Sequence, residues 1–350
     1  MIDLLVPASR LVIKKGLPLY LIQFVTTRCN ARCAFCFAID GRNEEMTVDD
    51  FARFTPGLGR LLYLSITGGE PFLREDLGEI IDIYCRTNRP RILLIPTNGY
   101  FTDRVVRIAR TAADRWPEIS FEISVSIDAI GKEHDDLRRV NGMYDRAADT
   151  IKALQSLSAT RANLHLMANL TIGDHNVATA NDTVDHLFDK LAMQNVTLNI
   201  ARSNRPRDLP DVDLSALGLI YRNVEDRIES RRGGFAHLKY GRLLNRFRRA
   251  RRRYLFDLIG SKGASMLPCQ AGQIAAVIGS RGDVFPCESW AKPIGNVLDP
   301  STSFAQIWSS PEAEEARAEI KQTRCHCTHE CFNNVNVMWS ARGILGALAP

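Results

Sequence analysis

The chain has 350 residues, of which 45% are hydrophobic and 24% charged, the ordinary range of a soluble globular protein. This composition excludes a disordered tail, a fibre and a coiled coil, and no apolar run is long enough to predict a transmembrane helix. The net charge of +5 is too small to indicate a nucleic-acid-binding protein, and the first residues lack the pattern of a secretory signal. A cytoplasmic location is expected, where nine cysteines are more typical of metal ligands or catalysts than of disulfides.

Between residues 19 and 201, short apolar runs alternate with longer amphipathic ones. The apolar runs predict strands at 20–25, 61–67, 91–96, 121–127, 163–171 and 196–200. The amphipathic stretches predict helices at 47–54, 75–87, 102–115, 144–157 and 176–192. Such alternation indicates an α/β fold with a parallel sheet, and six units are too few to close a full barrel. We therefore expect a partial (β/α)6 barrel, with its chemistry at the carboxyl ends of the strands.

A linker and a strongly basic helical segment are predicted over residues 202–262. From Arg222 to Arg253 the sequence has 12 Lys and Arg against three Asp and Glu. One interpretation is a solvated helical face whose aliphatic stems lie on the core. The second is a contact between Arg242–Arg253 and an anionic partner, such as a phosphate, an acidic peptide or a membrane surface.

Three cysteines follow the first predicted strand with the spacing Cys29-x3-Cys33-x2-Cys36. Three thiolates on one short loop can converge on one inorganic centre, but a closed zinc site needs a fourth ligand, and none is nearby in the sequence. On a [4Fe–4S] cluster, three cysteines leave one iron open for a small molecule, which is a catalytic arrangement. Phe35 lies where its ring can shield the cluster or pack on a flat ligand.

This motif resembles that of the radical SAM superfamily, in which C-x3-C-x-aromatic-C follows the first strand of a partial barrel. The resemblance covers most of residues 19–201. It implies that Cys29, Cys33 and Cys36 ligate three irons and that S-adenosylmethionine (SAM) chelates the fourth. It also implies an electron donor such as flavodoxin or ferredoxin, and reductive cleavage of SAM to a 5′-deoxyadenosyl radical that abstracts hydrogen from a substrate carbon.

Further motifs lie at the ends of the predicted strands, where this resemblance places the cofactor. Gly68-Gly69-Glu70 resembles the family's motif for the methionine amino group, and Asn98 follows the third strand, where a plain Asn-Gly turn is the alternative. Ser124, Ser126 and Asp128 share one face of the fourth strand, and the family places a Ser-x-Asp here against SAM. Arg138 resembles the arginine of an H-D-x-x-R element and is a candidate partner for a carboxylate, with Arg139 as its rival and a surface salt bridge as the alternative. Asn169 on the fifth strand is a further candidate contact.

Five more cysteines lie in the last quarter of the chain: Cys269, Cys287, Cys325, Cys327 and Cys331. Their context resembles the SPASM or shorter Twitch extension of radical SAM proteins, and a hairpin is expected around residues 280–282. Five cysteines instead of seven imply one auxiliary [4Fe–4S] cluster. Cys269 and Cys287 are expected as ligands together with two of the last three, among which the cramped Cys325-x-Cys327 spacing favours Cys331. A structural zinc site is the alternative.

The predicted organisation is an extension at 1–18, the barrel at 19–201, the linker and basic segment at 202–262 and the auxiliary-cluster domain at 263–350. The predicted function is a radical SAM oxidoreductase or maturase that oxidises or epimerises a small polar or phosphorylated molecule. The 28 residues before Cys29 are too few for a leader-peptide-binding domain, which favours this class over a maturase of ribosomal peptides or proteins. A third candidate class is an RNA-modifying radical enzyme that docks at the arginines, and a fourth is a non-catalytic iron–sulfur or zinc scaffold.

Overall fold

The computed structural model describes residues 16–36, 44–201, 209–210, 212–231, 233 and 241–348. Its first six strands are all parallel and lie within two residues of the predicted ranges. They are β1 (Tyr20–Thr26), β2 (Tyr63–Gly68), β3 (Ile92–Thr97), β4 (Ser120–Ser126), β5 (Leu164–Ile172) and β6 (Val196–Ile200). Neighbours in the sheet follow chain order, so this part is the expected partial (β/α)6 barrel.

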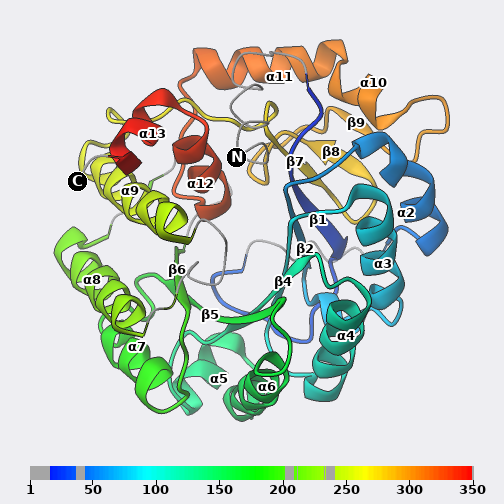
Figure 1. Cartoon of the computed structure of the whole chain (residues 1–350). Helices are drawn as coiled ribbons and strands as arrows, with labels where there is room; N and C mark the ends of the chain where they lie inside the picture. Colours follow the sequence, from blue (N-terminus) through cyan, green and yellow to red (C-terminus); the bar gives the residue numbers. More distant parts are fainter. Residues whose placement is uncertain are drawn as a thin grey trace.

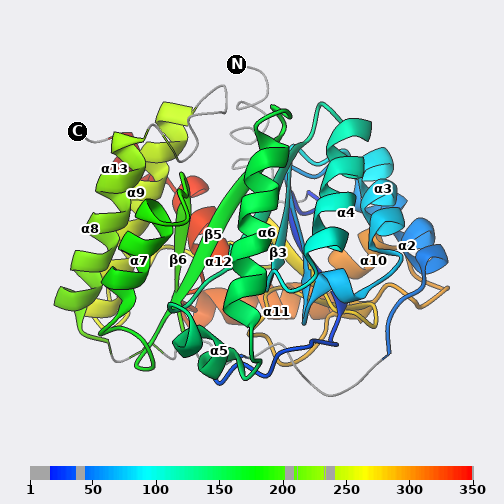
Figure 2. The ribbon, with the colours of Figure 1, turned by 90° about the horizontal axis from the view of Figure 1, so that it is seen from below.

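Helices lie on the outer side of these strands (Figure 2). They are α2 (Val48–Phe54), α3 (Leu77–Asn88), α4 (Thr102–Arg115), α5 (Lys132–Arg138), α6 (Met143–Ser158) and α7 (Ala180–Asp189), with short 3-10 turns at Thr55–Leu58 and Pro71–Leu73. A capping box between Thr47 and Asp50 begins α2. Sequence periodicity did not predict α5 as a helix, because Leu137 is its only apolar residue.

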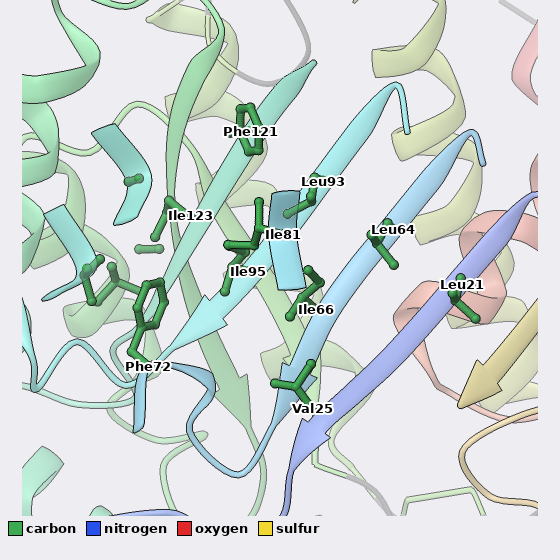
Figure 3. Packing of buried hydrophobic residues seen from close by; sticks show 14 of the residues in the cluster. Leu21, Val25, Leu64, Ile66, Phe72, Ile81, Leu93, Ile95, Phe121 and Ile123 are labelled. Atoms are coloured by element: carbon green, nitrogen blue, oxygen red, sulfur yellow. The ribbon is translucent and has the colours of Figure 1, made fainter. Parts of the chain in front are cut away.

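Successive side chains along each strand point to opposite faces, which gives the sheet an outer and an inner face. On β1 to β4, residues such as Leu21, Leu64, Leu93 and Phe121 belong to the main apolar core, with side chains on the side that faces α3 (Figure 3). The residues between them face the interior of the barrel, where the sequence is more polar. Because the outer positions bury the apolar core, the inner positions are available for function.

The sheet continues beyond β1 into the last part of the chain (Figure 1). Strand β7 (Ala275–Ile278) pairs parallel with β1 and forms the expected hairpin with β8 (Asp283–Phe285), which pairs with β9 (Gly295–Asn296). The helices α10 (Phe304–Trp308), α11 (Pro311–Gln322), α12 (Glu330–Met338) and α13 (Ala341–Leu348) follow. Because nine strands form one sheet, the barrel and the C-terminal part share a backbone hydrogen-bond network. The division at residues 201 and 262 stays a prediction.

The basic segment forms two helices, α8 (Leu214–Ser230) and α9 (Gly241–Gly260), and most of the linker at 202–210 lies outside the described residues. Arg252 pairs with Glu225 of α8 at 2.5 Å, Arg249 pairs with Glu229, and Arg251 pairs with Glu330 of α12. Much of the positive charge is therefore matched within the molecule. None of the helices in the described part of the chain is long and apolar enough to cross a membrane.

Candidate functional site: two groups of cysteines on one barrel

The loop that carries Cys29, Cys33 and Cys36 follows β1 at the carboxyl edge of the sheet. The backbone N–H groups of Arg32 and Ala34 donate to the carbonyls of Arg138 and Leu137, at 3.1 and 3.3 Å. These carbonyls lie in the last turn of α5, whose final C=O groups have no partner within the helix. The end of α5 therefore holds the cysteine loop.

A buried ion pair fixes α5 against the sheet. The Arg138 guanidinium donates from Nε and Nη2 to Oδ2 of Asp128, at 2.9 and 2.6 Å, and both side chains are at least nine-tenths buried. Asp128 also accepts from the Thr171 N–H at 2.9 Å. Its own N–H donates to Nδ1 of His134, whose pKa burial lowers to about 4. The structure thus places Arg138 in the interior, whereas Arg139 is exposed.

The Gly68-Gly69 pair brings the end of β2 into contact with the cysteine loop. The Gly69 N–H donates to Thr26 O at 3.0 Å, and the Glu70 N–H donates to Arg28 O at 2.8 Å. A Cβ at Gly68 would lie 2.3 Å from Thr26 O, and one at Gly69 would lie 2.2 Å from Arg28 O. Any side chain here would push the two loops apart.

Glu70 and Asn98 connect the ends of β2 and β3. The buried Glu70 carboxylate accepts from the Asn98 N–H at 2.7 Å, from Thr97 Oγ1 at 2.8 Å and from the Phe72 N–H at 3.1 Å. Burial raises the pKa of Glu70 to about 7, and these hydrogen bonds oppose the rise. The Asn98 amide donates to Asn30 Oδ1 at 2.8 Å, beside Cys29. Both residues lie at the cysteine loop, and their contact with SAM stays a prediction.

Ser126, Asn169 and Thr197 form a row across the inner face at the carboxyl edge. Ser126 is the register partner of Asn169, and Asn169 that of Thr197. Thr197 Oγ1 donates to Asn169 Oδ1 at 3.0 Å. Ser124 lies one pleat deeper on the same face and is 5% exposed. The predicted polar candidates on β4 and β5 therefore share one surface.

Two residues of the barrel were not predicted from the sequence. His175 stacks on Phe35, with ring centroids 4.6 Å apart and planes 8° apart. Its Nε2 is buried with no hydrogen-bond partner in the described part of the chain. Glu122 shares the inner face of β4 with Ser124 and Ser126, so the period-two pattern could have identified it. No motif pointed to His175, because its contact with Phe35 joins loops that are distant in the sequence.

The auxiliary cysteines pack against the inner face of β1. Ile22 and Phe24 belong to one apolar cluster with Cys269, Cys287, Cys325 and Cys331. Burial raises the pKa values of the Cys269 and Cys287 thiols, and the neighbouring Cys327 and Cys325 raise both further. Four thiols are therefore near enough to influence one another. Within the described ranges, no three His, Cys, Asp or Glu side chains are arranged to hold a single metal ion.

Cys331 has further neighbours on β2 and α9. Its charge acts on the Tyr63 hydroxyl of β2 and on Arg251 of α9. The Cys331 N–H donates to Nδ1 of His329, and His329 Nε2 lies 2.5 Å from Glu288 Oε2, next to Cys287. His329 thus connects the Cys331 backbone to Glu288.

Both groups of thiols suit an iron–sulfur cluster by the chemistry of their donors. Burial raises the pKa of Cys33 to about 11 and also raises that of Cys29, while the nearby Arg138 opposes both shifts. Cys36 acts electrostatically on both thiols, so the three lie close together. Crowded, partly buried thiols are costly to ionise without a cation, and bound iron supplies that positive charge.

Three cysteines at the end of the first strand of a partial barrel, with a second group against the same strand, define an iron–sulfur protein with two sites. The chain matches the Radical SAM superfamily over residues 24–187 and the SPASM iron–sulfur cluster-binding domain over residues 269–332. It belongs to the radical SAM superfamily, carries a C-terminal SPASM domain and is a radical SAM enzyme. Its cofactors are accordingly SAM, the [4Fe–4S] cluster of the radical SAM domain and the auxiliary iron–sulfur cofactor of the SPASM domain.

The relatives of this chain in sequence include a peptide maturation protein and a small-molecule synthase. It is 23% identical over 322 residues to the sporulation killing factor maturation protein SkfB of Bacillus subtilis, covering 88% of this chain and 69% of SkfB. It is 25% identical over 346 residues to the pre-heme d1 synthase of Dinoroseobacter shibae, covering 89% of this chain and 80% of that protein.

Solved structures support the fold. Streptococcus suis SuiB bound to S-adenosylmethionine matches with a TM-score of 0.60 at 18% identity, over 86% of this chain. The match spans 66% of the SuiB chain, so this chain corresponds to slightly less than two thirds of SuiB. SuiB has also been solved with its precursor peptide SuiA, and this structure matches equally well.

Proposed function

We propose that this enzyme is a maturase that oxidises a carbon centre in a peptide or protein. When bound, the first cluster and SAM supply a 5′-deoxyadenosyl radical that abstracts hydrogen, and the auxiliary cluster supplies a one-electron acceptor. The observation that carries the oxidation is the shared inner face of β1. Cys29 follows its carboxyl end, while Cys269 and Cys287 belong to the apolar cluster that contains Ile22 and Phe24 of this face, so both sites adjoin the barrel interior.

The residues around the first site orient the cofactor. Gly68, Gly69, Glu70 and Asn98 hold one side of the cysteine loop, and the pair of Arg138 with Asp128 holds the opposite side through α5. We assign the SAM-binding surface to these residues together with Phe35, Ser124, Ser126 and Asn169. The polar row at the carboxyl edge supports this assignment, because a zwitterionic cofactor with a ribose needs several hydrogen-bonding groups.

We further propose one auxiliary [4Fe–4S] cluster. The electrostatic influence of Cys325 and Cys327 on both Cys269 and Cys287 favours these four as its ligands. This choice departs from the sequence-based preference for Cys331, whose charge instead acts on Tyr63 and Arg251. All four iron positions would then carry a thiolate, which leaves no open iron for a second SAM.

A peptide substrate has more support than the small polar molecule favoured by the sequence alone. SkfB is described as a maturation protein, and SuiB has been solved with a precursor peptide. The similarity to pre-heme d1 synthase supports a small molecule as the second candidate. An RNA substrate or another anionic partner at Arg242–Arg253 has less support, because Arg249, Arg251 and Arg252 already pair with carboxylates of this chain.

The test is anaerobic turnover with short peptides encoded beside the gene. A peptide substrate increases 5′-deoxyadenosine formation and loses two hydrogens, which mass spectrometry detects. Cys269→Ala with Cys287→Ala should still form 5′-deoxyadenosine but should not complete the oxidised product. If no neighbouring peptide is altered while a small metabolite is, the second candidate is correct.

A further inference from the structure

On the inner faces of the six described parallel strands, Glu122 is the one acidic residue. Phe121, Ile123 and Val125 of β4 bury their side chains in the outer core, so Glu122 projects to the opposite face, and its exposed fraction is 5%. Four residues separate Glu122 from Ser126 at the carboxyl edge, a distance of about 13 Å along a strand. Glu122 is therefore deep in the barrel and well below the cysteine loop.

The described residues provide no partner for the Glu122 carboxylate. It makes no hydrogen bond or ion pair within the described ranges, in contrast to Glu70 with its three donors. Its register neighbours are Leu94 on β3 and His165 on β5. Along the inner faces of the six described parallel strands, no second residue is a carboxylate and none is a lysine or arginine.

Tyr63 of β2, two strands away, lies within electrostatic reach of this carboxylate. The charge of Glu122 acts on the Tyr63 hydroxyl, and Tyr63 stacks on Tyr20 with ring centroids 5.5 Å apart. A buried carboxylate near a phenol hydroxyl is suited to a cationic group, because the carboxylate attracts positive charge and both oxygens can accept hydrogen bonds from it. The nearest titratable groups on the inner faces of the described strands are His165 on the adjacent β5 and Tyr63 on β2.

A buried carboxylate is costly to ionise unless a partner is supplied. We propose that this partner is the substrate, and that Glu122 binds a lysine ammonium or arginine guanidinium of the peptide inside the barrel. This inference rests on the proposed function in taking the barrel interior as the peptide's binding place. Because Glu122 lies far below the carboxyl edge, it selects and positions the substrate and does not take part in the radical chemistry.

The experiment measures binding without turnover. Three N-acetylated tripeptide amides, Ala-Lys-Ala, Ala-Arg-Ala and Ala-norleucine-Ala, are titrated into the anaerobic, cluster-loaded enzyme with SAM at about pH 8. Wild-type enzyme should bind the lysine or the arginine peptide about ten-fold more tightly than the norleucine peptide, as expected for a partly desolvated charge pair. Glu122→Gln should remove this preference. The matched control, Glu118→Gln in the exposed loop before β4, should keep it.

Two results would overturn the inference: equal binding of the cationic and norleucine peptides by wild type, or a preference that persists in Glu122→Gln. If the Glu122→Gln variant does not bind its iron–sulfur clusters, the pH dependence of peptide binding by the wild type tests the inference. The wild-type preference must shrink as the pH falls below about 7, where the carboxyl becomes protonated. A Glu122-dependent preference in an enzyme that alters no peptide would keep this inference and reject the peptide-maturase proposal.

Discussion

The ion pair of Asp128 with Arg138 fixes α5, whose terminal carbonyls hold the cysteine loop. Asp128→Asn leaves the guanidinium buried without its counter-charge, which typically costs about 3–5 kcal/mol. We expect the free energy of unfolding, measured anaerobically with urea, to fall by an amount in that range. Lys132→Ala is the control: it breaks an exposed pair with Asp136 on the same helix, and the loss should stay below about 1 kcal/mol. Equal losses would show that the buried pair does not hold α5.

Glu122 makes the stability of the protein depend on pH. Burial raises its pKa from the ordinary 4.5 to about 7, so the folded state holds a proton that the unfolded state has lost. The wild type should therefore lose stability relative to Glu122→Gln as the pH rises from about 4.5 to about 7, approaching about 3 kcal/mol above that window. Thermal unfolding across this range measures the difference. A constant difference between the two proteins would contradict an unpaired, buried Glu122.

The iron content of single cysteine variants identifies the ligands of the auxiliary cluster. Cys325→Ala should lose the auxiliary cluster, because its thiol is one of the four that influence one another. Cys331→Ala should keep the iron and sulfide of the wild type. The opposite result would restore Cys331 as the ligand and remove Cys325.

At the scale of elements, helix α9 is fixed by pairs with its neighbours. The Arg252 pair with Glu225 is partly buried, with 25% and 12% of the two side chains exposed, and burial raises the pKa of Glu225. Arg252→Ala should therefore lower the free energy of unfolding by about 1–3 kcal/mol. Arg246→Ala, at an exposed position on the same helix, should have no measurable effect. Retention on a heparin column compares the anion binding of the two variants. If only Arg252→Ala weakens retention, the paired arginines bind an anionic partner.

The elements also show what a sequence pattern can predict. The six strands were predictable because apolar runs of strand length recur between amphipathic stretches. Helix α5 was not predictable from apolar periodicity, because its contacts are polar. Its terminal carbonyls accept hydrogen bonds from the Arg32 and Ala34 N–H groups, and its Arg138 pairs with Asp128. The candidates at the strand ends were predictable from motifs. The electrostatic effect of Glu122 on Tyr63 and the stacking of His175 on Phe35 join distant segments, and only the folded chain brings them together.

For the whole molecule, the continuous nine-stranded sheet is the decisive feature. Parallel pairing of β7 with β1 places the C-terminal cysteines against the strand that ends near Cys29. Under the proposed function, a substrate inside the barrel would lie between the radical source at the carboxyl edge and the auxiliary site on β1. We therefore expect that either group of cysteines can be removed while the other still binds its cluster.

The central claim is that the two groups of cysteines have separate roles in one radical enzyme, and the direct measurement is 5′-deoxyadenosine formation from SAM under dithionite. Wild type and the Cys269→Ala, Cys287→Ala variant should both form it, since the auxiliary cluster is not needed to cleave SAM. The Cys29→Ala, Cys33→Ala, Cys36→Ala variant should form none while retaining the auxiliary iron. Formation of 5′-deoxyadenosine by this triple variant would contradict the account.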